Sequence, residues 1–413
     1  MGKDEPIIKT LLDTDFYKHT TGQFIFLRHP DVTVRSAFKN RTTQIKLAKV
    51  IDLGRLREEL DHVRTLRHGN SELHYLRGTN EYQERMFVEP YLEFLKNLQL
   101  PEYDLEERDG QIRLEFGGKW AEQTHWEIPA LSIVNELYTS AVMAPFSRFE
   151  KELFFAEGKQ RLSQKKKILH KRPDITFVEF GTRRRFSKDW QRYVIEVLME
   201  ELPYQFRGTS NVKFAMDMGL VPMGTSPHEP NMVMSAIMHG SDEKIRLSQK
   251  TFRDEWWDQY GWGLSIILPD TYGSKFTFDT MTAEEAHAWK GFRHDSGPPQ
   301  RFTKWVLRFY NKHGVDTKKK VIIFSDGLRV ETMIGAADYI HNQIRYTFGW
   351  GTNLMNDLGI KPVSIVVKPV EANGIGLVKL SDNPAKAIGR PEDIEGAKRI
   401  FGYDGGVYGE CFY

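Results

Sequence analysis

The sequence predicts an α/β protein built from an irregular βα barrel and an amino-terminal α+β sheet domain. Two patterns carry this prediction. From about residue 175, short apolar runs end in small or polar residues, and a helical stretch follows each run. Neighbouring runs lie roughly 20–45 residues apart, the usual length of a strand–helix unit. The first ~130 residues instead mix helical and strand-like patterns without this alternation.

The composition is that of an ordinary globular protein. The chain has 413 residues, of which 40% are hydrophobic and 28% charged, which excludes disordered, collagen-like and membrane classes. This length allows two or three lobes with a large buried core. Lys and Arg number 58 against 56 Asp and Glu, for a net charge of +2. A general nucleic-acid-binding role therefore gets no support, and any anion site must be local.

The compartment follows from what the sequence lacks. A single cysteine, Cys411, cannot form an internal disulfide or a CxxC metal site, and it fits a reducing compartment. No apolar run approaches the roughly 18 residues that span a bilayer. The first residues, MGKDEPIIKT, lack the apolar stretch of a signal peptide. We therefore expect a cytoplasmic protein with no membrane partner.

The amino-terminal region contains both kinds of secondary structure. Apolar side chains have helical spacing at 59–68 and 90–100. Apolar and polar residues alternate as in strands at 31–41 and 111–120. These segments predict an α+β domain over residues 1–140, whose boundary is soft because no low-complexity linker follows it.

The second region predicts the barrel, over residues 141–364. Its apolar runs are ITFVEFGT, VPMGT, LSIILPDT, FRHDSG, VIIFSDG, IRYTFGWGT and VSIVVKPVEANG. In a βα barrel the loops after the strands gather at one face and carry the site. The predicted active face is built from 180–185, 224–228, 270–271, 293–297, 325–327 and 349–352. An open, doubly wound sheet is the alternative, because one sequence does not show closure.

Two strand tips have the chemistry of a phosphate site. Gly349–Asn353 and Ser325–Gly327 place glycines where a helix begins, and free N–H groups at such a point bind phosphate. Neither segment matches a dinucleotide fingerprint or a Walker A loop. A plain turn is the alternative interpretation of both.

Other tips carry charges. Three arginines lie at 183–185, and guanidinium groups bind carboxylate or phosphate bidentately. Arg293 and Asp295 suit an acidic substrate and a sugar hydroxyl or Mg²⁺, although Asp295 also suits a helix cap. His228 has Glu229 beside it, and a carboxylate neighbour can orient an imidazole for base or nucleophile chemistry.

Taken together, the tips predict a site with several anion contacts. No paired-His or HExxH spacing accompanies His228, so the sequence predicts no metal cluster made by the protein alone. Neither a Ser/His/Asp set nor a pair of catalytic carboxylates is evident. Such a site suits a substrate with several phosphates, where positioning and charge stabilisation supply most of the catalysis.

The order of the motifs then identifies a family. The segments LLDTDFYK, FGTRRRFS, GTSN, GTSPHE, RHDSG, FSDG, FGWGTNL, VVKPVEANG and KLSDNPAK occur in that order from Leu11 to Lys386. They resemble the nicotinate phosphoribosyltransferases that use a phosphorylated histidine. The resemblance covers nearly the whole chain, with little contribution from residues 40–130.

The resemblance implies a reaction and a fold. The family transfers phosphoribosyl from phosphoribosyl pyrophosphate (PRPP) to nicotinate, releasing pyrophosphate and nicotinate mononucleotide for NAD synthesis. It implies ATP as a co-substrate and Mg²⁺ bound with PRPP near Asp295. The implied fold is that of a type II phosphoribosyltransferase, with segment 365–413 returning to the amino-terminal domain. A homodimer with shared sites is also implied.

Residue roles follow from the same resemblance. His228 would accept the ATP phosphate, and Arg293 would bind the nicotinate carboxylate with Thr225 close by. Tyr17 would reach the pyridine ring from the partner subunit, opposite Phe180. The implied contacts to ribose, pyrophosphate and the 5′-phosphate are Arg183, Asp295, Ser325, Gly351, Thr352 and Lys368.

Three prolines depart from the family pattern, and two rival functions stay open. Pro227 and Pro230 flank the His–Glu pair and predict a stiffer loop, while Pro298 replaces an acid. The nearest rival is nicotinamide phosphoribosyltransferase, whose members carry an aspartate where this chain has Ser210. A buried aspartate would repel a carboxylate, so Ser210 favours the acid. The second rival is a barrel that binds phosphate ligands without catalysis.

Overall fold

The computed structural model describes residues 5–80 and 85–406, so Cys411 lies outside the described residues. The amino-terminal elements are α1 (Phe16–Arg28), β1 (Thr33–Asn40), α2 (Leu47–Val50), α3 (Leu53–Thr65), α4 (Asn70–Gly78), α5 (Glu89–Asn97), β2 (Tyr103–Arg108), β3 (Gln111–Lys119), α6 (Trp120–Gln123), η1 (Thr124–Trp126) and α7 (Glu127–Met143). The helices and strands predicted in this region correspond to α3, α5, β1 and β3, and all four are confirmed.

The remaining elements alternate strands and helices before the chain returns. They are α8 (Arg148–His170), β4 (Phe177–Glu179), η2 (Thr182–Arg184), α9 (Lys188–Glu201), β5 (Phe206–Thr209), α10 (Val212–Met218), α11 (His228–Ile237), α12 (Asp242–Tyr260), β6 (Ile266–Ile267), η3 (Pro269–Tyr272), α13 (Ser274–Thr280), α14 (Ala283–Ala288), β7 (Gly291–His294), α15 (Pro299–Lys312), η4 (Thr317–Lys319), β8 (Val321–Phe324), α16 (Val330–Ile340), β9 (Arg345–Trp350), α17 (Thr352–Met355), β10 (Ile365–Ala372), β11 (Ile375–Gly376), η5 (Pro384–Lys386) and α18 (Pro391–Phe401).

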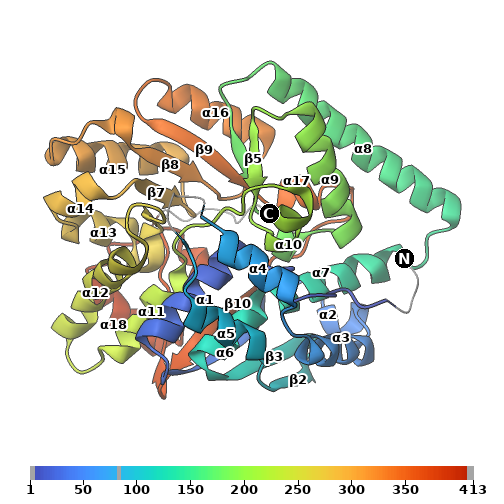
Figure 1. Cartoon of the computed structure of the whole chain (residues 1–413), viewed down its shortest axis with the longest axis horizontal. Helices are drawn as coiled ribbons and strands as arrows, with labels where there is room; N and C mark the ends of the chain where they lie inside the picture. The colour runs from blue at the N-terminus through green and yellow to red at the C-terminus, as the bar shows by residue number, and fades with distance from the viewer. Residues whose placement is uncertain (1–4, 81–84, 407–413) are drawn as a thin grey trace.

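The amino-terminal domain is built on an antiparallel sheet of order β11-β10-β1-β3-β2. Alternate residues of β1 are buried, as a sheet with one covered face requires. Asp109 and Gly110 both have positive φ, which matches the tight hairpin turn between β2 and β3. Strand β10 pairs antiparallel with β1, from Val34 opposite Ala372 to Asn40 opposite Ile365. Strand β10, from the carboxy-terminal part of the chain, therefore lies inside the first sheet, between β11 and the central strand β1 (Figure 1).

Six parallel strands form the second sheet, in the order β5-β4-β9-β8-β7-β6. The run VPMGT forms no regular strand, yet it joins the two ends of this sheet. Pro222 bridges Thr209 of β5, Met223 N–H donates to Thr209 O (2.9 Å), and Ser226 N–H donates to Ile266 O of β6 (3.3 Å). The sheet is thus closed irregularly, with its members following one another around the ring in chain order. The predicted fold class is confirmed, and the open, doubly wound alternative is wrong.

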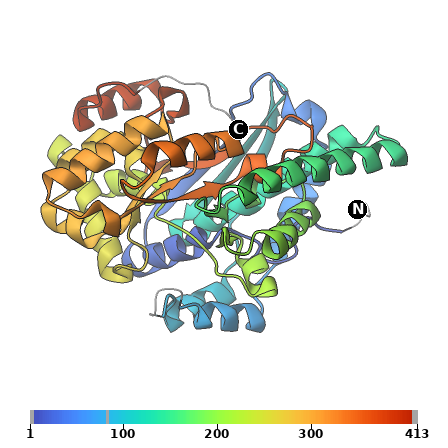
Figure 2. The ribbon, with the colours of Figure 1, turned by 90° about the horizontal axis from the view of Figure 1, so that it is seen from above.

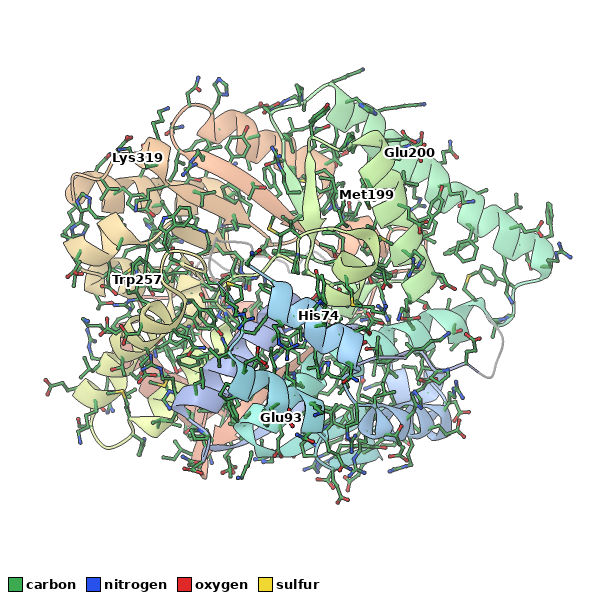
Figure 3. All side chains as sticks on the ribbon, in the orientation of Figure 1. His74, Glu93, Met199, Glu200, Trp257 and Lys319 are labelled. Carbon is green, nitrogen blue, oxygen red and sulfur yellow. The ribbon has the colours of Figure 1, made fainter. Side chains whose placement is uncertain are left out.

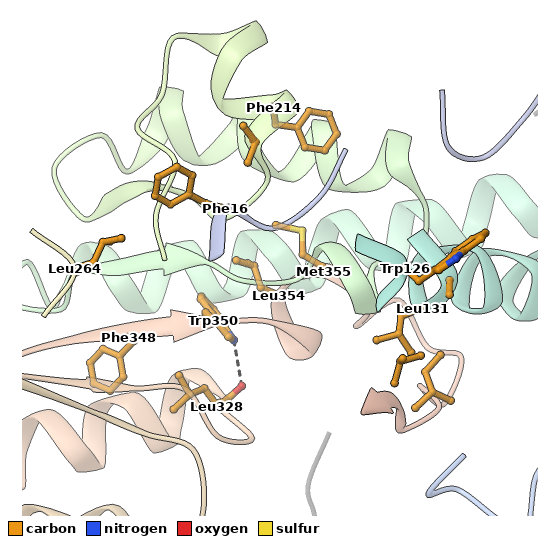
Figure 4. Close-up of a cluster of buried hydrophobic side chains, with 14 of the residues drawn as sticks. Phe16, Trp126, Leu131, Phe214, Leu264, Leu328, Phe348, Trp350, Leu354 and Met355 are labelled. Atoms are coloured by element: carbon orange, nitrogen blue, oxygen red, sulfur yellow. Dashed lines mark hydrogen bonds between the residues drawn. The ribbon is translucent and has the colours of Figure 1, made fainter. Parts of the chain in front are cut away.

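Helices surround the barrel and connect the two sheets. Helix α8 projects along one side as the longest helix of Figure 1, and α18 lies at the periphery beside α12 in Figures 1 and 2. In the core, Phe348 and Trp350 of β9 are fully buried, and Trp350 Nε1–H donates to Leu328 O at 3.1 Å (Figure 4). This bond ties the tip of β9 to the loop after β8. Within the described part of the chain, no helix is both long and apolar enough for a membrane crossing.

Candidate active site

One pocket opens at the carboxyl ends of the barrel strands, where the strand tips were predicted to meet. Its walls come from the tips of β4, β7, β8 and β9, from the segment before α11, and from β10. The charged lining residues described are Arg41, Arg183, Arg184, Arg293, Arg329, Lys368, Lys379 and Lys386 against Asp295 and Asp326. Because the whole chain carries only +2, this is the local concentration of positive charge that an anion site needs.

His228 is the first residue of α11 and lines the pocket, although its side chain is only 5% exposed. Its Nε2 lies 3.2 Å from Asp295 Oδ2, and its Nδ1 lies 2.9 Å from the Thr271 hydroxyl. Because an ionised carboxylate can only accept, we assign the proton to Nε2 and the lone pair to Nδ1. Burial, with a further contribution from Lys379, lowers the pKa of His228 to about 4 against the opposing effect of the carboxylates. The imidazole is therefore neutral near pH 7 and keeps a lone pair for nucleophilic chemistry.

The flanking prolines fit the start of this helix. Pro227 is the N-cap residue in an extended conformation, and Pro230 lies in the first turn, where backbone N–H groups have no intrahelical partner. Pro298 likewise caps α15. The three prolines thus define where helices begin and break no helix.

A second carboxylate, Asp270 of η3, lies behind His228. Its Oδ1 is 3.5 Å from His228 Nε2, and its Oδ2 accepts from the Ser296 hydroxyl at 2.7 Å. Lys379 Nζ lies 3.8 Å from Asp270 and 3.9 Å from Asp295. Burial acts against ionisation of Asp270, but Lys379 and His228 hold its pKa at about 2. Both carboxylates beside the histidine are therefore charged at neutral pH.

Arg293, on β7, is a pocket cation without a counter-ion among the described residues. Its side chain makes no ion pair or hydrogen bond with any described residue, and its Nε is buried without a partner. Burial lowers the pKa of Arg293 from its ordinary value, although it stays charged at neutral pH. A partly buried guanidinium that the protein leaves unpaired is suited to a ligand carboxylate, which it can bind through two parallel hydrogen bonds.

Aromatic rings line the same pocket. A Cβ on Gly349 would come within 2.3 Å of the Phe180 ring, so only glycine lets this ring lie across the tip of β9. Tyr17, on α1, lines the pocket of its own chain, and its hydroxyl donates to Glu127 Oε2 at 2.9 Å. Tyr17 thus lines this pocket from its own chain, and the contribution of a partner subunit's tyrosine to the site stays a prediction. The homodimer itself stays a prediction.

Glu127, at the start of α7, collects groups from three other elements. Its carboxylate lies 2.7 Å from Lys18 Nζ, 2.9 Å from Lys368 Nζ and 3.6 Å from Arg183. Although it is buried, these cations hold its pKa well below the ordinary value. Glu127 thereby fixes Tyr17, Arg183 and Lys368 in the pocket wall before any ligand binds.

Two predicted site residues lie outside the pocket lining, and their roles are corrected. Glu229 does not orient His228, because successive residues on a helix point in different directions. It accepts from Lys18 Nζ (2.7 Å) and Trp120 Nε1 (2.8 Å) inside the amino-terminal domain. Ser210 donates to Asp15 Oδ1 at 2.7 Å, so it anchors the segment before α1 and makes no contact in the pocket wall.

The predicted phosphate tips do come together. Thr225, Ser325, Gly351 and Thr352 all line the pocket. The Ser325 hydroxyl donates to His294 O at 2.9 Å. Lys386 Nζ reaches in from the carboxy-terminal segment, donates to Asp295 O at 2.8 Å and pairs with Asp326.

His228, Asp270 and Asp295 form a group that the sequence did not indicate. One potential ligand atom from each lies within 4.8 Å of the others. The three belong to separate loops, so no spacing along the chain signals them. The two carboxylates fit Mg²⁺, which binds proteins through one or two carboxylates together with substrate phosphates.

Several functional residues escaped prediction. Asp270 stood in a predicted tip without a role, and a polar residue directly after an apolar run was its signal. Lys379 and Lys386 occur in KLSDNPAK. This segment contributed to the family resemblance, but no role was predicted for its lysines. No sequence pattern indicates a role for Glu127, because the residues that it contacts lie far from it in the chain.

Comparisons with known proteins agree with this geometry. The model of the nicotinate phosphoribosyltransferase (NAPRTase) family matches residues 175–404, and that of the NAPRTase N-terminal domain matches residues 12–135. A nicotinate phosphoribosyltransferase from Vibrio cholerae has a similar structure, with a TM-score of 0.85 and 30% identity over 97% of this chain and 94% of that one. One from Porphyromonas gingivalis has a TM-score of 0.84 and 29% identity over 96% of this chain and 100% of that one.

Proposed function

The chain belongs to the nicotinate phosphoribosyltransferase family, which transfers phosphoribosyl from PRPP to nicotinate in NAD salvage, and from that premise we propose how its pocket performs the reaction. The observation that carries the proposal is the unpaired guanidinium of Arg293, whose Nε is buried. It binds the nicotinate carboxylate, and the neutral amide of nicotinamide would leave this charge uncompensated. The site therefore selects the acid.

The rings and the other cations place the two substrates. Tyr17 and Phe180 hold the pyridine ring so that its nitrogen faces the anomeric carbon of PRPP. Attack by that nitrogen forms the N-glycosidic bond as the C–O bond to pyrophosphate breaks. Arg183 and Lys368 stabilise the departing pyrophosphate, while the tips at Ser325 and Thr352 hold the 5′-phosphate. No protein nucleophile is needed on the sugar.

Mg²⁺ and ATP complete the proposal. Asp295, with Asp270 behind it, would hold the Mg²⁺ that accompanies PRPP, and the ion would supply charge neutralisation on the leaving group. The neutral imidazole of His228 keeps its proton on Nε2, beside the two carboxylates, and attacks the γ-phosphorus of ATP with the lone pair of Nδ1. An N–P bond forms, the P–O bond to ADP breaks, and the phosphohistidine is later hydrolysed, which drives synthesis of the mononucleotide.

Substitution of Arg293 tests acid recognition. In Arg293→Gln we expect kcat/KM for nicotinate to fall about 100-fold, because a charge-assisted bidentate contact contributes roughly 3 kcal/mol. The ratio of nicotinate to nicotinamide turnover should fall with it. Mononucleotide formation from each base is measured, with the exposed Arg207→Gln as the matched control. An unchanged ratio would contradict the role of Arg293.

Phosphorylation of His228 is tested separately. Wild-type protein incubated with γ-labelled ATP should acquire acid-labile, base-stable label, and ADP should form together with mononucleotide. His228→Ala should lose the label, while His74→Ala, at an exposed position on α4 (Figure 3), should keep it. Equal labelling of the two variants would exclude His228 as the acceptor.

A further inference from the structure

Ser381, in the segment between β11 and α18, is buried beside the candidate active site and has no role in the reaction described above. Its side chain is completely inaccessible to solvent. Its hydroxyl donates to Asp270 Oδ2 at 2.9 Å and lies 2.9 Å from Ser296 Oγ. A residue of the carboxy-terminal segment thus contacts the carboxylate that faces His228.

The backbone of Ser381 is strained. Its φ is 68°, in the left-handed region, where side chains other than those of Asn and Asp are uncommon. Of the four non-glycine residues with positive φ in the described ranges, the other three are Asp109, Asn342 and Asn373. Strain of this kind persists where the surroundings fix the conformation, and it gathers at functional sites.

The hydrogen bonds around Asp270 divide its two oxygens between different tasks. Oδ2 accepts from the hydroxyls of Ser381 and Ser296. Oδ1 accepts no hydrogen bond, although it is buried, and it lies 3.5 Å from His228 Nε2. The two hydroxyls therefore hold one oxygen still, and the other is turned toward the imidazole.

A small hydrophobic cluster keeps Ser381 in place. Tyr272 of η3 stacks on Phe401 of α18, with ring centroids 3.7 Å apart and planes 7° from parallel. Leu380 belongs to the same cluster, and its N–H donates to Thr271 O at 2.8 Å. The Tyr403 hydroxyl donates to Ser381 O at 2.8 Å. This packing fastens the strained residue to the loop that carries Asp270.

We propose that Ser381 is a positioning residue for the histidine centre: its hydroxyl, held in a strained conformation by the carboxy-terminal helix, orients Asp270 toward His228. The role of His228 in this statement rests on the proposed function. Ser381 does not touch substrate and acts through Asp270 alone.

A double-mutant cycle on the full-length protein tests the proposal. Ser381→Ala, Asp270→Asn and the double variant are compared by kcat and KM for mononucleotide formation with ATP present. Ser381→Ala should lower kcat about tenfold and leave the KM for nicotinate within twofold. In the Asp270→Asn background the same change should have no further effect, because residues that act as a unit are not additive. Ser248→Ala, which removes another fully buried hydroxyl bonded to the backbone, is the control and should change neither constant.

Ser381→Gly separates the hydroxyl from the strain. Glycine adopts a φ of 68° freely, so this variant should unfold at a higher temperature than Ser381→Ala while sharing its lower kcat. Wild-type kcat in Ser381→Gly, or additive effects in the cycle, would overturn the proposal. The cycle is measured on mononucleotide, and ADP and protein-bound phosphate are followed separately. Absence of both would therefore overturn the phosphohistidine step while the cycle still decides the coupling between Ser381 and Asp270.

Discussion

At the scale of single residues, the pocket depends on positions so closely packed that only one residue type fits. Gly349 is the clearest case, because the Phe180 ring occupies the space where its Cβ would lie. Gly335, inside α16, has open space around it. The two glycines form a natural pair for comparison.

We expect Gly349→Ala to lower the free energy of unfolding by about 1–3 kcal/mol, the usual range for an overpacked core. It should also raise the KM for nicotinate, since Phe180 must move to make room. Gly335→Ala should instead stabilise the protein by about 0.5–1 kcal/mol, as expected for alanine inside a helix. Urea unfolding and steady-state kinetics measure both effects. Equal effects of the two substitutions would contradict the steric role assigned to Gly349.

Residues at strand tips were predictable from sequence, and residues behind them were not. His228, Arg293 and Ser325 each follow an apolar run, and the ends of parallel strands meet at one face. The direction of a side chain depends on tertiary packing, which explains why Glu229 and Ser210 were misplaced. Glu127 was missed because its contacts join segments that are far apart in the chain.

At the scale of elements, α1 carries both Tyr17 and a buried histidine. The ring of His19 lies 5.5 Å from that of His68 and 5.9 Å from that of His125. Burial lowers the pKa of His125 to about 3 and holds that of His19 well below its ordinary value. In the unfolded chain the pKa of histidine returns to about 6.5.

This cluster predicts a steep loss of stability in acid. Both folded-state pKa values are depressed, so the stabilisation is fully present above about pH 6.5 and declines as the pH falls toward 3. In His125→Gln the slope of unfolding free energy against pH should shrink by about 1.4 kcal/mol per pH unit between about pH 4 and 6. The reason is that unfolding of this variant takes up one proton fewer. Urea unfolding at several pH values measures the slope. His74→Gln, at an exposed position, is the control, and an unchanged slope in His125→Gln would contradict burial of a neutral imidazole.

At the scale of the whole molecule, both ends of the chain build the pocket. Tyr17 comes from α1 and Lys368 from β10, while the barrel supplies the strand tips between them. The alternation of runs and helices predicted a parallel α/β sheet but left its closure open, and the return of segment 365–413 followed only from the family resemblance. Closure through residues 222–226 was not, because that segment lacks the pattern of a regular strand.

Tyr17 and Arg293 line the same pocket within one chain, which predicts that variants at these two positions fail to complement each other. Tyr17→Ala and Arg293→Gln should each be impaired, and mixtures of the two proteins should show only the sum of their separate activities. If Tyr17 served a partner's pocket, mixed dimers would regenerate one intact site. Activity of the mixture is measured after joint unfolding and refolding, with each variant refolded alone as the reference. Recovery above the sum would contradict the assignment of Tyr17 to its own chain.

The way the barrel closes also has a dynamic consequence. β8 is paired at four positions on each side, whereas 222–226 is joined to its neighbours by one bridge and a few hydrogen bonds. A closed sheet opens most readily where few hydrogen bonds hold it. The segment 222–226 is such a place, and it leads directly into His228. Amide hydrogens of Met223 and Ser226 should therefore exchange with solvent faster than those of β8. The segment that leads into His228 is therefore expected to open locally more often than β8 does.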